Sequence, residues 1–145
     1  MIKIMFVCTG NTCRSPMAEY LLKDIIKKAG VTDIKVTSAG LNVCENDTIN
    51  EKAKVALKKF GIVVRKFNPK KAVPELCRKQ NAVICMTERH KNFFVGFKNV
   101  YTISELTGLN EISDPYGLNQ DAYDECAATL KCACEEIFEL LNKKD

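Results

Sequence analysis

A short apolar run, residues 2–7, leads straight into a tight loop and then into the start of a helix. The run is apolar at every position except Lys3, which is typical of a strand buried in a parallel sheet. After the loop, Ser15 can cap a helix and Pro16 suits its first turn. A buried strand joined to a helix by a tight loop predicts an α/β fold with a parallel sheet.

The rest of the chain continues this alternation. Apolar residues recur at helical spacing after Pro16 until Gly30, and residues 34–38 alternate as a second strand would. A capping-box pattern at residues 48–51 predicts a helix through Phe60 that Gly61 ends. Residues 82–86 and 100–102 are predicted strands, and residues 121 to about 142 a long amphipathic helix. With no repeat and no linker in the sequence, residues 1–145 are predicted to form one domain.

Composition bounds the compartment and the partners. The 145 residues carry a formal net charge of +4, a mild excess that does not indicate a nucleic-acid partner. Eight cysteines would suit a secreted disulfide scaffold, but the apolar run before Cys8 is too short for a signal segment. No stretch approaches the ~20 apolar residues that span a bilayer. We therefore expect a cytoplasmic protein with reduced thiols and no membrane contact.

The first loop places five residues between Cys8 and Arg14. A tight loop entering a helix points backbone N–H groups inward, and the helix dipole adds positive character, so it can hold a phosphate dianion. Gly10 is expected to permit the turn, and Arg14 can donate a two-pronged hydrogen bond. The same environment favours the nucleophilic thiolate of Cys8. Cys8 could instead be a core residue in a chance pattern, but the strand-to-helix context favours catalysis.

Four motifs carry a resemblance to a known family: residues 7–19 (VCTGNTCRSPMAE), 38–40 (SAG), 86–87 (MT) and 114–117 (DPYG). Together they closely resemble the signature of low-molecular-weight protein tyrosine phosphatases. The resemblance implies a single-domain, three-layer fold with a four-stranded parallel sheet flanked by helices. It also implies a phosphocysteine intermediate, no metal or other cofactor, phosphorylated protein substrates, inhibition by phosphate-like oxyanions, and a monomer.

The resemblance also implies roles beyond the nucleophile. Asp114 would be the general acid that protonates the leaving group and later activates water, in a loop stiffened by Pro115. The alternative for Asp114 is a turn without chemistry. Tyr116 would form one wall of the substrate slot, unless it only packs in the core.

Within the loop, the candidate substrate-binding residues are Thr9, Gly10, Asn11, Thr12, Cys13 and Ser15. Asn11 and Ser15 resemble residues that shape the loop and stabilise the thiolate. Ser38 resembles a partner that ties the loop to the second strand, and local backbone bonding is its alternative. Cys13 is expected to trap an oxidised Cys8 as a reversible disulfide, and a thiol that only packs is the alternative.

The substrate depends on Thr12, the residue before the second loop cysteine. Family members that act on phosphotyrosine typically have an aliphatic residue there, which packs on the phenyl ring. A bacterial branch that acts on phosphoarginine has threonine, whose hydroxyl can bond the guanidinium, and Asp114 would then face a cation. This resemblance favours phosphoarginine, with phosphotyrosine as the alternative if Thr12 is merely a small loop residue.

Three other classes fit less well. A thioredoxin-coupled arsenate reductase needs two relay cysteines close together after the third strand, but Cys85 is followed next by Cys126. A metal-binding module is disfavoured because Cys132 and Cys134, two apart on a helix, point to different faces. A module that only binds phosphoproteins would need neither a thiolate nor an acid. His90, the sole histidine, has no obvious partner and is assigned no role.

Overall fold

The computed structural model describes residues 1–143. Within that range the elements, in chain order, are β1 (Ile2–Cys8), α1 (Arg14–Lys28), β2 (Ile34–Gly40), α2 (Glu51–Lys58), α3 (Pro74–Arg78), β3 (Ala82–Cys85), α4 (Glu88–Lys91), β4 (Val100–Thr102), α5 (Ile103–Thr107) and α6 (Gln120–Asn142). The strands of this range form a four-stranded parallel sheet in the order β2-β1-β3-β4. The predicted fold class is confirmed.

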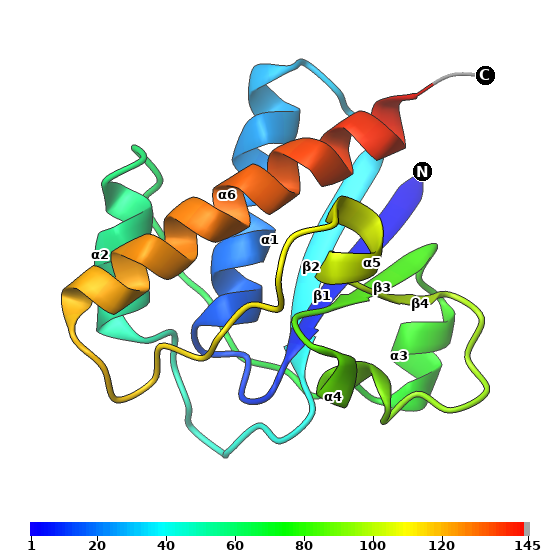
Figure 1. The fold of residues 1–145 in the computed structure, drawn as a ribbon, viewed down its shortest axis with the longest axis horizontal. Helices are drawn as coiled ribbons and strands as arrows, with labels where there is room; N and C mark the ends of the chain where they lie inside the picture. Colours follow the sequence, from blue (N-terminus) through cyan, green and yellow to red (C-terminus); the bar gives the residue numbers. More distant parts are fainter. Residues whose placement is uncertain (144–145) are drawn as a thin grey trace.

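Helices cover both faces of the sheet, so the molecule has three layers (Figure 1). On one face, α1, α2 and α6 enclose the larger core together with Ile4, Phe6 and Cys8 of β1. On the other face, Met5 and Val7 of β1 pack with apolar residues of α3 and of the segment after α4. Because both faces of β1 are buried, its sequence is apolar without alternation.

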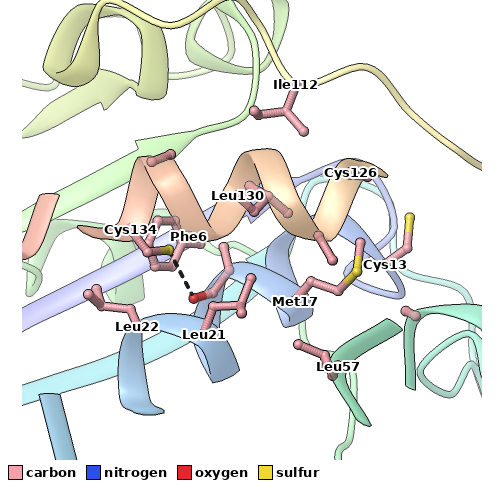
Figure 2. Close-up of a cluster of buried hydrophobic side chains, with 14 of the residues drawn as sticks. Phe6, Cys13, Met17, Leu21, Leu22, Leu57, Ile112, Cys126, Leu130 and Cys134 are labelled. Carbon is pink, nitrogen blue, oxygen red and sulfur yellow. Dashed lines mark hydrogen bonds between the residues drawn. The ribbon is translucent and has the colours of Figure 1, made fainter. Parts of the chain in front are cut away.

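The 23-residue helix α6 crosses α1 and covers the larger core (Figure 1). Met17 and Leu21 of α1 and Leu130 and Cys134 of α6 lie together in this core (Figure 2). Full burial of each Met or Leu side chain contributes roughly 1.5–3 kcal/mol. Within residues 1–143, every helix is too short or too polar to span a bilayer.

The topology places the loop after β1 at a point where the chain changes direction across the sheet. From β1 the chain runs through α1 to β2 on one side, and then through α3 to β3 on the other side of β1. The carboxyl ends of parallel strands share one edge, and ligands of such folds bind where the crossovers diverge. Residues 8–15 lie at that point.

Three helix boundaries differ from the sequence predictions. Ser15 is not the cap of α1: the N-cap is Cys13, which forms no side-chain capping bond. The capping box at residues 48–51 is also wrong, because α2 begins after Asn50, whose side chain accepts a hydrogen bond from Lys52 N at 2.8 Å. Helix α2 ends at Lys58, before the predicted end at Phe60.

The sequence did not predict the short helices α3, α4 and α5, which have five, four and five residues. Helices of one turn or slightly more are too short to display a helical period of apolar residues. A capping box is present, but at α5. There Thr102 Oγ1 accepts from Glu105 N and the Glu105 carboxylate accepts from Thr102 N.

Candidate active site

The loop at residues 8–15 is held against the end of β2 by backbone contacts. Cys8 pairs with Gly40 in the sheet register, and the backbone of residues 41 and 42 donates to the carbonyl oxygens of Cys8 and Thr9, at 3.0 and 2.8 Å. A Cβ atom on Gly40 would lie 2.8 Å from both Thr9 O and Asn11 N. Only glycine therefore fits at the end of β2, because the loop lies directly against its Cα.

The turn that we expected from Gly10 is made by Asn11, which has a φ of +57° while Gly10 has no positive φ. Asn11 is fully buried, and its side chain fixes the turn. Its amide nitrogen donates to Ser15 Oγ at 2.8 Å and to Ser38 Oγ at 2.9 Å, and its amide oxygen accepts from Lys70 N at 3.0 Å. Asparagine tolerates this left-handed backbone better than most residues.

Ser38 extends this hydrogen-bond network to Glu19, a residue for which the sequence predicted no role. The Ser38 hydroxyl donates to Glu19 Oε1 at 2.6 Å, and the buried Glu19 carboxylate pairs with Lys23 at 2.5 Å. The local-backbone alternative for Ser38 is therefore not what the structure contains. Glu19 lies four residues after Ser15 in α1, a spacing that places both on one helix face. That spacing was the signal that could have identified it.

The Cys8 sulfur lies 2.9 Å from Ser15 Oγ and 3.4 Å from Ser15 N, at the N-terminal end of α1. Because the Ser15 oxygen accepts a bond from Asn11, the hydroxyl proton of Ser15 can point to the sulfur at 2.9 Å or to the more distant Ala39 O at 3.4 Å. Two donors and the positive end of a helix thus face one sulfur atom.

Arg14 is buried at the base of the site, with only 5% of its surface exposed. Its Nη1 donates to Ile112 O at 3.0 Å, while Nη2 lies 3.4 Å from Thr9 Oγ1 and 3.5 Å from Asp114 Oδ2. The buried Nε has no hydrogen-bond partner within residues 1–143. A buried, unpaired N–H is costly, and a phosphate oxygen would satisfy it.

Asp114 reaches the loop from a segment that is about a hundred residues away in sequence. Its carboxylate accepts from Tyr116 N at 3.1 Å and lies 3.6 Å from the Cys13 thiol, so it faces the loop. The Asp114 side chain is 46% exposed and is open to a leaving group or water. Burial, aided by the charges of Cys8 and Asp114, raises the pKa of the Cys13 thiol to about 12.

A hollow of about 580 Å³ joins these groups. Its lining includes six residues of the loop after β1, two residues of the segment 112–117, here called the acid loop, and part of residues 42–51. The lining residues of the two loops are Cys8, Thr9, Gly10, Thr12, Cys13, Arg14, Asp114 and Tyr116. Tyr116 is 72% exposed at this hollow, so it is not core packing. Asn11, Ser15 and Ser38 are fully buried and support the loop without lining the hollow.

His90 also contacts the loop, although no sequence motif predicted a role for it. Its Nε2 lies 2.9 Å from Thr9 Oγ1 and its Nδ1 lies 3.1 Å from Thr87 Oγ1. The residue is 5% exposed. Burial, and then the charge of Arg14, lowers the pKa of His90 to about 4. A threonine three residues before the histidine is a helix-capping spacing, and it was the only local signal available.

The remaining cysteines are free thiols. Cys85 and Cys126 are buried, and burial is the main cause that raises the pKa of each to about 12. Cys132 is exposed, whereas Cys134 is buried and donates to Ala18 O, so the two point to different faces as predicted. Within residues 1–143 no three His, Cys, Asp or Glu side chains are grouped to hold a metal ion.

Comparison with known proteins decides the family. The family profile described as low molecular weight phosphotyrosine protein phosphatase matches residues 3–145. The chain belongs to this family. It is therefore a cysteine-dependent protein phosphatase of the low molecular weight class.

Relatives of this low molecular weight phosphatase carry two different substrate names. It is 33% identical over 147 residues to the protein-arginine-phosphatase of Bacillus subtilis, and the match covers 97% of each chain. It is 30% identical over 156 residues to the low molecular weight protein-tyrosine-phosphatase PtpB of Staphylococcus epidermidis, covering 98% of this chain and 96% of that one. A solved mutant of YwlE arginine phosphatase, with a phosphorylated active-site serine, has a TM-score of 0.91 at 31% identity and covers 99% of this chain and 97% of its own.

Proposed function

We propose that this phosphatase removes phosphate from phosphoarginine side chains of proteins, with Cys8, Arg14 and Asp114 as its catalytic residues. The observation that carries the proposal is the convergence at one hollow of a sulfur facing two donors, a buried guanidinium and a half-exposed carboxylate. Nucleophile, phosphate clamp and acid are the groups that covalent phosphoryl transfer requires.

The first step transfers the phosphoryl group to Cys8. Arg14 and the backbone N–H groups of the loop hold the phosphate oxygens, and the Cys8 thiolate attacks phosphorus in line with the leaving group. The S–P bond forms as the P–N bond of phosphoarginine breaks. Asp114, protonated at the start of this step, gives its proton to the departing guanidino nitrogen.

The second step releases phosphate. Asp114, now a carboxylate, accepts a proton from a water molecule as the water oxygen attacks phosphorus. The S–P bond breaks and its electron pair returns to Cys8, so free phosphate and the thiolate form of the enzyme are regenerated. Phosphate and vanadate are expected to compete with substrate, because they occupy the same donors.

The choice of phosphoarginine rests on Thr12. Thr12 lines the hollow beside Cys8, and its hydroxyl can accept a hydrogen bond from a guanidinium. The named activity of the Bacillus subtilis relative supports this choice. Phosphotyrosine is the second candidate, supported by the named activity of the Staphylococcus epidermidis relative and by the exposed Tyr116, which can stack on a phenyl ring.

A comparison of two substrates tests the proposal. We expect wild type to have a higher kcat/KM on phosphoarginine peptides than on phosphotyrosine peptides, and Thr12→Ile to lower the first and raise the second by at least tenfold. The Cys8→Ser variant is the control, because it should hydrolyse neither peptide while still binding phosphate. If wild type prefers phosphotyrosine, the enzyme is a tyrosine phosphatase and the role given to Thr12 is wrong.

A further inference from the structure

We infer that His90 is a positioning residue that orients Arg14 for phosphate binding, acting through the hydroxyl of Thr9. The inference rests on the proposed function, because it concerns the same phosphate site. His90 belongs to α4, a separate element that follows β3, yet its ring contacts the loop after β1. The imidazole is therefore a direct link between two strand ends at the base of the site.

The ring of His90 is fixed at both nitrogen atoms. Nδ1 bonds Thr87 Oγ1, which also accepts from the His90 backbone N–H at 3.2 Å as the N-cap of α4. Nε2 bonds Thr9 Oγ1 at 2.9 Å. Either tautomer of the ring satisfies both contacts, because each threonine hydroxyl can donate or accept. The side chain thus holds Thr9 in one rotamer.

Thr9 passes this constraint to the guanidinium. Arg14 is a donor only, so its Nη2, 3.4 Å away, uses the Thr9 hydroxyl as an acceptor. The other contacts of Arg14, to Ile112 O and Asp114, lie on the acid-loop side of the guanidinium. Thr9 supplies the contact from the loop after β1. Without a fixed Thr9 hydroxyl, the guanidinium would be held only by its contacts to the acid loop.

The chemistry of the residue fits this task. A buried group beside Arg14 has to be uncharged, since a second cation would repel the guanidinium. The low pKa of His90, about 4, keeps the ring neutral at physiological pH while both nitrogens stay bonded. Lysine would bring a charge, and an aliphatic side chain would leave the hydroxyls of the exposed Thr9 and the half-buried Thr87 without this partner.

The test measures oxyanion affinity in variants that remove or restore the link. We expect His90→Phe to raise the inhibition constant of inorganic phosphate and the KM for p-nitrophenyl phosphate by about fivefold to tenfold, an effect of the size expected for one lost hydrogen bond. His90→Gln, which keeps a side-chain amide, should restore affinity to within about threefold. Thermal denaturation of each variant separates these changes from a loss of folding.

A double-mutant cycle shows whether His90 acts through Thr9. We expect Thr9→Val to weaken phosphate binding, Thr9→Ser to retain it, and the pair Thr9→Val with His90→Phe to bind no worse than Thr9→Val alone. Additive losses would overturn the inference, as would equal phosphate affinity in Thr9→Val and Thr9→Ser. The Thr9 pair keeps the test decisive if His90→Phe does not fold.

Failure of the proposed function gives a different result from failure of this inference. If wild type neither binds phosphate nor hydrolyses p-nitrophenyl phosphate, the proposed function is wrong, and the inference fails with it. If wild type does both and His90→Phe lowers the melting temperature without changing the inhibition constant, His90 is only structural. In that case the inference alone is wrong.

Discussion

At Asp114, two contacts from the loop after β1 meet on one carboxylate. One oxygen lies 3.5 Å from Arg14 Nη2, and the other accepts from the buried Cys13 thiol at 3.6 Å. The proposed acid is therefore held directly beside the proposed phosphate clamp.

Replacing the acid should affect poor leaving groups most. Asp114→Asn keeps the shape of the side chain but cannot donate a proton of suitable acidity, so we expect kcat on phenyl phosphate to fall by about a hundredfold or more. The fall on p-nitrophenyl phosphate should be much smaller, since that leaving group needs little protonation. Rates measured across a series of substituted phenyl phosphates check this, and equal slowing throughout would remove Asp114 as the acid.

At the scale of elements, the end of β2 supports the loop after β1 through backbone contacts. Gly40 closes the strand, and the residues after it donate to the loop carbonyls. Ser38 is fully buried and joins the loop, through Asn11, to Glu19 of α1. The loop is thus attached to two neighbouring elements before any ligand arrives, so binding needs little rearrangement of the backbone.

Gly40→Ala should therefore be severely disruptive. Its new Cβ would lie 2.8–2.9 Å from backbone atoms of the loop, and backbone cannot rotate away as a side chain can. We expect a loss of about 1–3 kcal/mol in the free energy of unfolding, measured by urea denaturation. Gly10→Ala is the matched control, because its Cβ would meet only the Thr12 hydroxyl, at 3.6 Å. Equal stability of the two variants would contradict the claim that the loop packs directly against the Cα of Gly40.

The sequence predicted the strands and the long helices well, because each has a clear apolar period or a buried run. Cys8, Arg14 and Asp114 were proposed as catalytic residues because they lie in local motifs, and in the structure all three line one hollow. The supporting groups were harder: the positive φ at Asn11 and the contact from His90 to Thr9 depend on the register in which parallel strands bring distant segments together. No local pattern encodes that register, so only the folded structure shows these contacts.

At the scale of the whole molecule, every part of the site lies at one edge of the sheet. The loop after β1, the residues after β2, the segment from β3 into α4 and the acid loop before α6 meet there. The two faces of the sheet pack against the helices that cover them (Figure 1). His90 is a buried titratable group at this edge, so its protonation makes the stability of the whole fold depend on pH.

The lowered pKa of His90 predicts that the stability of the fold decreases as the pH falls. Its pKa is about 4 in the folded protein, against an ordinary value of 6.5, so the unfolded chain binds the proton more tightly. Stability from this group is fully present above pH 6.5 and is lost as the pH falls towards 4, by up to about 3 kcal/mol. Urea denaturation at pH 7 and pH 4 should show a larger loss in wild type than in His90→Gln. Equal losses would show that His90 does not couple folding to pH.

The position of Thr12 has an evolutionary consequence. Its backbone oxygen accepts from Asn50 N at 2.8 Å and helps to hold the loop, while its side chain lines the hollow. A different side chain at this position therefore leaves the backbone bonds of the loop unchanged. Under the proposed role of Thr12, a single nucleotide substitution from threonine to isoleucine would redirect the enzyme to another phosphorylated amino acid without breaking these backbone bonds.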